Sequence, residues 1–267
     1  MNGHSGRLLT RLFLWSLMMG ALTACMTTRP QSLIDLTHAF DQDTIYWPHN
    51  KQFQWARTSW GMTDGGYWYA SADFSASEHG GTHIDAPIHF GRDRSTVDQI
   101  PLERLTGPAV VIDVRAQCAD NPDYEMTVAD IQAWEARHGR IPDGAIVFML
   151  SGWGQRWPDK KRYLGSDTPE DPLTLHFPGL SRDAAEFLVT RRAVRGAGID
   201  TASIDPGRSR DFPTHRVLNG ADVYALENVA KLEQVPPRGA TVFALPIKIK
   251  GGTGGPVRII AFVPQAE

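Results

Sequence analysis

The stretch His79-Gly80-Gly81-Thr82-His83-Ile84-Asp85-Ala86-Pro87-Ile88-His89-Phe90 decides how this chain is interpreted, because it gathers three of the nine histidines and an aspartate. Gly80-Gly81 and Pro87 oppose a continuous helix, so we expect a turn that leads into a short extended segment. Side chains alternate in an extended segment, which places His83 and Asp85 on one face, and His89 follows if the segment stays straight. Two imidazoles and a carboxylate on one rigid loop are typical of a site for zinc or a similar divalent cation.

Length and composition indicate an ordinary globular protein. The chain has 267 residues, of which 42% are hydrophobic and 21% are charged, and this is enough for one large domain or two small ones. The formal net charge is −3, and no block of basic residues stands out. This charge balance argues against nucleic acid as a partner.

The N-terminal residues have the pattern of an export signal. Arg7 and Arg11 precede an apolar run from Leu12 to Leu22, which is too short to span a bilayer. The run ends in Leu-Thr-Ala-Cys, which resembles a bacterial lipobox, with Cys25 as the acylated residue. We therefore expect a signal peptide over residues 1–24, a tether over 25–32, and a lipid anchor on the periplasmic side of a bacterial membrane. A plain signal peptide or an uncleaved anchor is the alternative.

The remaining chain, residues 33–267, is expected to form one α/β domain with a mixed sheet. Apolar and alternating segments predict strands at 33–37, 53–60, 67–74, 109–114, 145–150, 199–204, 223–229, 241–245 and 258–263. Capping residues and a helical apolar stripe predict two long helices, at 127–137 and 181–195. A loop is expected at 151–165.

Several tryptophans are candidates for an apolar wall around a substrate. Trp47, beside Pro48 on an expected loop, is the favoured substrate contact, and Trp153 and Trp157 are further candidates. Core packing is the expected fate of Trp68 on its strand. The glycine-rich segment 251–255 lacks the Lys-Ser/Thr ending of a phosphate-binding loop, so a tight loop near the metal is expected there.

The histidine-rich signature resembles that of the cyclases, a family of metal-dependent hydrolases that includes bacterial kynurenine formamidases and isatin hydrolases. The resemblance extends to residues 33–38, to Asp205 with 212–215, to Glu227-Asn228 and to the glycine-rich 251–256. It implies a swivelling β/β/α architecture and an assembly of two or more copies.

The resemblance also implies a division of labour at the site. His79, His83 and Asp85 would bind a first cation, and Asp85 would bridge to a second one completed by His215 and Glu227. The cofactor would be Zn²⁺ or Mn²⁺, one or two per chain, since imidazole and carboxylate ligands suit both metals. His89 matches the family's catalytic histidine.

The resemblance further implies hydrolysis of a small cyclic or N-acyl aryl amide, such as isatin or N-formylkynurenine, by metal-activated water. His89 would protonate the leaving nitrogen; the alternative is that it orients the carboxylate of Asp85. Two other functions stay open at this point. One is a lipid-anchored binding protein without turnover, and the other is a related metalloenzyme that acts on a lactone.

Overall fold

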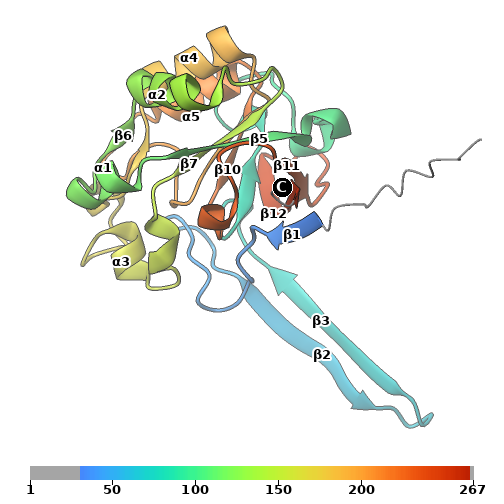
Figure 1. Ribbon diagram of the computed structural model, residues 1–267. Coiled ribbons are helices and arrows are strands. Elements are labelled where there is room, and N and C mark those ends of the chain that lie inside the picture. Colours follow the sequence, from blue (N-terminus) through green and yellow to red (C-terminus); the bar gives the residue numbers. More distant parts are fainter. Residues whose placement is uncertain (1–30, 265–267) are drawn as a thin grey trace, which may run out of the picture.

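The computed structural model describes residues 31–264, which form one domain around a barrel-like mixed sheet (Figure 1). The strand order is β1-β12-β11-β5-β7-β9-β10-β4, and a further pairing between β12 and β4 closes the barrel. Strands β5, β7, β9 and β10 run parallel to one another, and the other pairings are antiparallel. The bounds are β1 Gln31–Asp35, β4 His83–Asp85, β5 Thr106–Asp113, β7 Ile146–Leu150, β9 Gly196–Ile199, β10 Tyr224–Glu227, β11 Thr241–Pro246 and β12 Gly254–Pro264.

Helices cover one side of this barrel. The two long ones are α2 (Val128–His138) and α4 (Arg182–Arg192), which begin at the capping residues Thr127 and Ser181. Shorter helices are α1 (Arg115–Asp120), α3 (Lys160–Leu164) and α5 (Pro213–Gly220). A small parallel pair, β6 (Glu125–Met126) and β8 (Gly179–Leu180), lies beside them. The prediction of one α/β domain with a mixed sheet is confirmed.

Two apolar cores result from this layering. In β5, Ala109 and Val111 point into the barrel, whereas Val110 and Ile112 pack under the helices. Both faces of the central parallel strands are therefore buried, which explains why they are continuous apolar runs in the sequence.

The segment between β1 and β4 leaves the body as a long hairpin. Strands β2 (Gln54–Met62) and β3 (Trp68–Ser75) form their own two-stranded sheet, and within residues 31–264 they pair with no other strand. The hairpin projects well beyond the barrel (Figure 1). Its two strands are confirmed, but the core position predicted for Trp68 is wrong, because this side chain is 59% exposed.

Other boundaries differ from the prediction for local reasons. The second long helix stops at Arg192 because Ala193 adopts a left-handed conformation with φ of 48°. The strand expected at 199–204 lies earlier, at Gly196–Ile199, and the following residues form the loop over the site. The expected 151–165 loop contains α3 and a 3₁₀ turn at Trp153–Arg156.

The N-terminal predictions fall almost entirely outside the described residues. The predicted signal peptide (1–24), Cys25 and most of the predicted tether (25–32) lie there. Gln31 and Ser32, predicted to end the tether, belong to β1. Between residues 31 and 264, no helix combines the length and the apolar character needed to cross a bilayer.

Candidate metal centre

Strand β4 supplies two of the candidate ligands and is held on both edges. It pairs with β10 on one side and with β12 on the other. In the β10 pairing His83 lies opposite Glu227, and residues opposite each other in an antiparallel pair share a face. The register alone therefore brings Glu227 to the side of the sheet that carries His83 and Asp85.

The turn before β4 requires glycine. Gly80 forms an isolated bridge with Tyr46, and a Cβ on Gly80 would lie 2.0 Å from the Tyr46 ring. Gly81 follows with φ of 57°, in the left-handed region. This tight turn brings Nδ1 of His79 to 2.6 Å from Oδ1 of Asp85.

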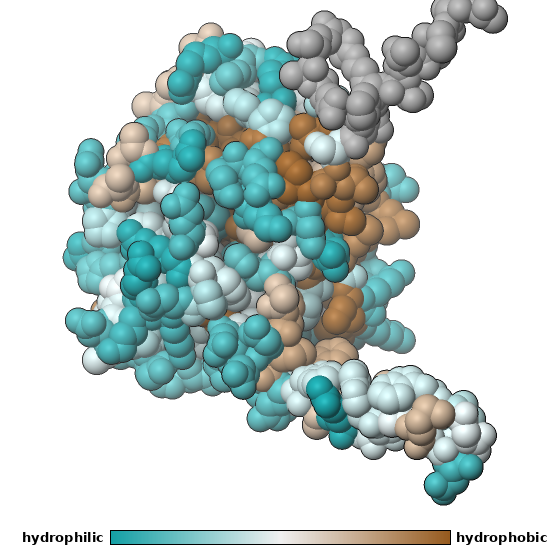
Figure 2. All heavy atoms as spheres, turned by 60° about the horizontal axis from the view of Figure 1, so that its bottom comes forward, coloured by the Kyte–Doolittle hydropathy of each residue, from teal (hydrophilic) through white to brown (hydrophobic). Residues whose placement is uncertain are grey.

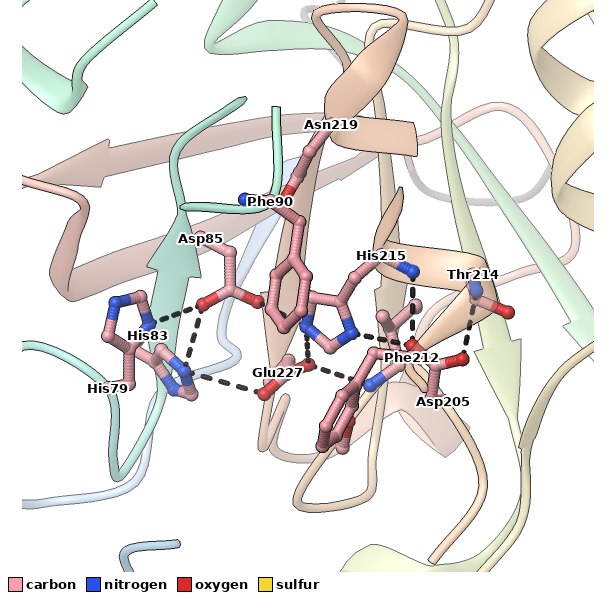
Figure 3. Close-up of polar contacts among 12 residues, drawn as sticks. His79, His83, Asp85, Phe90, Asp205, Phe212, Thr214, His215, Asn219 and Glu227 are labelled. Atoms are coloured by element: carbon pink, nitrogen blue, oxygen red, sulfur yellow. Dashed lines mark hydrogen bonds and ion pairs between the residues drawn. The ribbon is translucent and has the colours of Figure 1, made fainter. Parts of the chain in front are cut away.

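His215 reaches the same place from the first turn of α5. The carboxylate of Asp205 accepts hydrogen bonds from the backbone amides of Thr214 and His215, which fixes the start of the helix. Nε2 of His215 then lies 3.2 Å from Oδ2 of Asp85 and 3.1 Å from Oε1 of Glu227. Residues 130 or more positions apart in the chain thus meet in one cluster (Figure 3).

Each of the three candidate imidazole ligands is oriented by a hydrogen bond on the nitrogen that faces away from the cluster. Nδ1 of His83 donates to the carbonyl of Gly81 (2.9 Å), and Nδ1 of His215 donates to Asp205 (2.6 Å). Nε2 of His79 donates to the hydroxyl of Thr253 (2.9 Å).

The Thr253 hydroxyl in turn donates to the carboxylate of Glu78, so its oxygen acts as acceptor toward His79. The other nitrogen of each imidazole faces the carboxylate oxygens, and once deprotonated it would offer its lone pair to a cation, the arrangement typical of metal-bound histidine.

The donor set fits a divalent cation. Oxygen and nitrogen ligands about 2.0–2.2 Å from a zinc ion lie about 3 Å from one another. The contacts of His83 with Asp85 and with Glu227 are 3.3 and 3.4 Å, and those of His215 are 3.2 and 3.1 Å. His79, His83 and Asp85 form one group with metal-ligand spacing. The two carboxylates and three imidazoles are therefore preorganised around a common space.

Charge in this cluster is balanced by protons. Burial opposes the ionised form of Asp85, yet the charge of His83 and a hydrogen bond from His215 hold the pKa of that carboxyl well below its usual range. Burial would lower the pKa of His83, but the charges of Asp85 and Glu227 raise it to about 9. Burial and the charge of Asp85 raise the pKa of Glu227. A bound cation would displace these protons and take over their role.

His89 lies beside the cluster on a different backbone segment. The extended run does not stay straight, because Pro87–His89 forms a 3₁₀ turn. The His89 ring stacks on His79 with centroids 3.9 Å apart, and it forms a group with Asp85 and His215 whose nitrogen and oxygen atoms lie within 4.8 Å of one another. Burial lowers the pKa of His89 to about 3, so its ring is neutral near pH 7 and keeps a lone pair on one nitrogen. Proton transfer and metal ligation are both within its reach.

A cavity of about 270 Å³ opens above these groups. Trp47, the predicted substrate contact, lies in its wall together with Phe90 and Phe212, and the Trp47 and Phe212 rings are 5.9 Å apart. Asn219 fixes Phe90 by accepting a hydrogen bond from its backbone amide. The full lining is Ile45, Tyr46, Trp47, Asn50, His79, Gly80, His83, Asp85, His89, Phe90, Ala202, Ser203, Phe212, His215, Glu227 and Asn228.

The other tryptophan candidates lie outside the wall. Trp153 is buried and donates its indole N–H to the carbonyl of Tyr163, and Trp157 stacks on His38. Sequence reasoning overlooked Phe90 and Phe212, although Phe90 ends the histidine signature and Phe212 directly precedes the helix that carries His215.

Comparison with known proteins bears on this geometry. The sequence profile of the Cyclase family matches residues 34–206. The chain belongs to the cyclase family. An isatin hydrolase of Roseibium aggregatum is 38% identical to it over 71% of the chain and 73% of the relative. A kynurenine formamidase of Salinibacter ruber is 31% identical over 86% of the chain and 96% of the relative.

Solved structures agree with these relatives. An isatin hydrolase bound to the product analogue thioisatinate has a TM-score of 0.81 and 32% identity, over 88% of the present chain and 93% of that structure. A structure described as a potential metal-dependent hydrolase with cyclase activity has a TM-score of 0.64 and 26% identity, over 89% of the present chain and all of that structure (100%). These relatives are thus hydrolases of amide C–N bonds, and metal dependence is part of the description of a neighbour.

Proposed function

We propose that this chain is a metal-dependent hydrolase that opens the C–N bond of a small cyclic or N-acyl aryl amide, the class to which isatin and N-formylkynurenine belong. The observation that carries the proposal is the convergence of His79, His83, Asp85, His215 and Glu227 at the floor of an aromatic-walled cavity. The names of the relatives support the amide class.

The residues divide into three tasks. A divalent cation held by the five candidate ligands would supply a water molecule acidic enough to attack at neutral pH. His89, neutral and next to the cluster, would accept the proton of that water on a ring nitrogen and deliver it to the leaving nitrogen. Trp47, Phe90 and Phe212 would hold a planar aryl ring in place, which orients the carbonyl toward the cluster.

We infer that the cation is Zn²⁺ or Mn²⁺, because three imidazoles and two carboxylates suit both. A catalytic zinc site commonly uses three protein ligands and keeps a position open. Five candidate ligands therefore support two cations that share Asp85.

The test is reconstitution. The purified full chain is stripped of metal with a chelator and then reloaded with Zn²⁺ or Mn²⁺, while hydrolysis of isatin, N-formylkynurenine and an aryl lactone is followed and the metal content is measured. We expect amide hydrolysis to vanish with the metal and to return on reloading. Turnover that persists after complete metal removal would refute the proposal, and turnover of the lactone alone would redirect it to esters.

We also propose that the protein is exported and lipid-anchored on the periplasmic side of a bacterial membrane. The support is the apolar run that ends in Leu-Thr-Ala-Cys at Cys25. Mass spectrometry of membrane-extracted protein should find a diacylglyceryl group on Cys25, and an N-terminus that still begins at Met1 would refute this assignment.

A further inference from the structure

The segment 151–165 lies outside the cavity wall, and so do its tryptophans, Trp153 and Trp157. Figure 2 shows one face of the body, on which hydrophobic side chains gather in a patch. The aromatic side chains of the segment avoid such exposure, because Trp153 and Tyr163 are buried and Trp157 is half-buried. The segment therefore makes its aromatic contacts with the interior of the molecule.

Buried contacts fasten this segment around Tyr163, which lies on α3. The carboxylate of Asp200 accepts hydrogen bonds from the backbone amide and the hydroxyl of Ser151, at the start of the segment. The indole N–H of Trp153 donates to the carbonyl of Tyr163 at 2.7 Å. The Trp157 ring lies edge-on to the Tyr163 ring, with centroids 5.3 Å apart. These restraints hold the Tyr163 side chain in one place.

The Tyr163 hydroxyl contacts Asn228, the residue that follows the candidate ligand Glu227. It donates to Oδ1 of Asn228 at 2.9 Å and lies 3.1 Å from the carbonyl oxygen of Asp200. Burial and the negative charges of Asp200 and Glu227 hold the pKa of Tyr163 well above its usual range, so the hydroxyl keeps its proton and remains a donor. Within residues 31–264, this hydroxyl is the single hydrogen-bond donor to Oδ1 of Asn228.

The other end of the Asn228 amide reaches the turn before β4. Nδ2 of Asn228 donates to the carbonyl of Gly81 at 2.8 Å, and the same carbonyl accepts from Nδ1 of His83 at 2.9 Å. A carbonyl oxygen has two lone pairs, so it can accept both hydrogen bonds. The opposite orientation of the amide would set Oδ1 against the Gly81 carbonyl oxygen, two acceptors without a proton between them. The amide is therefore satisfied in one orientation, with its oxygen toward Tyr163.

The backbone of Asn228 binds the same turn. Its φ is 53°, in the left-handed region that asparagine adopts more readily than most residues. Its amide donates to the carbonyl of Thr201 at 2.9 Å, and its carbonyl accepts from the hydroxyl of Thr82 at 2.7 Å. Asn228 thus contacts both residues that directly precede His83.

We propose that Tyr163 is a positioning residue for the candidate metal ligand His83, and that it acts through the side-chain amide of Asn228. The hydroxyl holds the amide, the amide holds the Gly81 carbonyl, and this carbonyl fixes the tautomer and the orientation of the His83 ring. The inference rests on the proposed function, because it takes His83 to be a metal ligand. Partners that orient a metal-bound histidine commonly change metal affinity about 10–100-fold. Tyr163 lies two hydrogen bonds beyond the Gly81 carbonyl, so we expect an effect near the lower limit.

Two other roles for Tyr163 make different predictions. A tyrosine that contacts the substrate would lie in the cavity wall, but this wall contains Asn228 and not Tyr163. A tyrosine that only stabilises the fold would lower the melting temperature of a variant and leave its metal affinity unchanged. Tyr224 offers a matched comparison. It is 0% exposed, as Tyr163 is, and its hydroxyl donates to the backbone carbonyl of Arg104 at 2.9 Å, outside the cavity lining.

The experiment measures the Zn²⁺ affinity of the purified full chain by competition with a chromogenic chelator. The melting temperature of the metal-free chain and steady-state kinetics on isatin at saturating Zn²⁺ are measured on the same samples. Tyr163→Phe removes the hydroxyl alone, and Asn228→Gly removes the amide while keeping a residue that accepts the left-handed backbone. The double variant combines these two changes, and Tyr224→Phe is the control.

We expect Tyr163→Phe to weaken Zn²⁺ affinity about tenfold and Asn228→Gly at least as much, while Tyr224→Phe stays within about twofold of the unaltered chain. Turnover of Tyr163→Phe at saturating Zn²⁺ should stay near that of the unaltered chain, because the hydroxyl does not touch the substrate. The double variant should bind Zn²⁺ as Asn228→Gly does, because Tyr163 acts through the amide.

Three outcomes would overturn the proposal: a Zn²⁺ affinity of Tyr163→Phe equal to that of the unaltered chain, an equal loss in Tyr224→Phe, or additive losses in the double variant. If Tyr163→Phe does not fold, Asn228→Gly decides, and a normal Zn²⁺ affinity there would overturn the proposal as well. An unaltered chain that binds no Zn²⁺ would refute the metal centre itself, so failure of the proposed function is distinguishable from failure of this inference.

Discussion

The metal centre and the hairpin of β2 and β3 (residues 54–75, here called the arm) are neighbours in sequence and opposites in chemistry. The arm ends at Ser75, and the first candidate ligand, His79, follows four residues later. In the centre, polar groups from the turn before β4, from β4, from α5 and from β10 contact one another, and all of them except His79 are buried. In the arm, large apolar side chains contact mainly one another and stay at least half exposed. The difference teaches that a buried polar cluster satisfies its hydrogen bonds within one chain, whereas the apolar face of a projecting ribbon is left uncovered by the described part of the chain.

The largest effect on the metal centre is expected from the substitution Asp85→Asn. Asp85 contacts His79, His83 and His215, so its loss removes the group that holds the centre together. We expect metal content to fall below one per chain and kcat/KM to drop at least about a thousandfold. The matched control, Asp73→Asn on the polar face of the arm, should retain both metal and turnover. Normal turnover in Asp85→Asn would show that the cluster is structural only.

His89→Gln separates the two roles that the geometry allows. Removal of a proton-transfer group costs about 10²–10⁴-fold in kcat and leaves the metal in place. The measurements are steady-state kinetics and metal analysis on the same sample. A parallel loss of metal would instead place His89 among the ligands or their orienting partners.

Thr253→Val probes orientation from outside the cluster. The valine side chain has a similar shape but cannot accept the hydrogen bond from His79, so we expect metal affinity to weaken about 10–100-fold. Thr253→Ser keeps the hydroxyl and should bind metal nearly as the unaltered chain does. Competition with a chromogenic chelator gives the affinity directly. Equal affinities in the two variants would remove Thr253 from the site.

A pair of glycine substitutions gives the smallest effect and compares the two regions most directly. Gly80→Ala places a methyl group 2.0 Å from the Tyr46 ring, which we expect to destabilise the fold by about 1–3 kcal/mol. Gly61→Ala in the arm meets no atom within 4 Å and should change the free energy of unfolding by less than about 0.5 kcal/mol. Urea denaturation measures both. Equal effects would mean that the turn before β4 is looser than described.

The sequence predicts the local geometry of the metal centre, but not the contacts between distant segments. The spacing of His83 and Asp85 predicts a shared face, and the strand β4 provides it. Only the resemblance predicts His215 and Glu227, since no local pattern reveals that β10 pairs with a strand about 140 residues earlier. Their convergence on Asp85 is therefore a result of tertiary structure.

The errors also have physical causes. Aromatic alternation correctly predicts strands in the arm, but it cannot tell a strand face that the chain covers from one that it leaves exposed, and the prediction for Trp68 is wrong for that reason. The predicted strand 199–204 lies further along the chain than β9, Gly196–Ile199, because Ile204 is apolar but belongs to a loop, where its amide donates to Glu227.

The position of β4 between two neighbouring strands has a consequence for how the centre opens. The amide hydrogens of β4 should exchange with deuterium only when the barrel itself unfolds, because both edges of this strand are paired. His79 precedes β4 in the chain, and its side chain is 18% exposed, against 3% for His83. Departure of a cation would therefore start with the movement of the His79 imidazole, while His83 and Asp85 on β4 keep their positions.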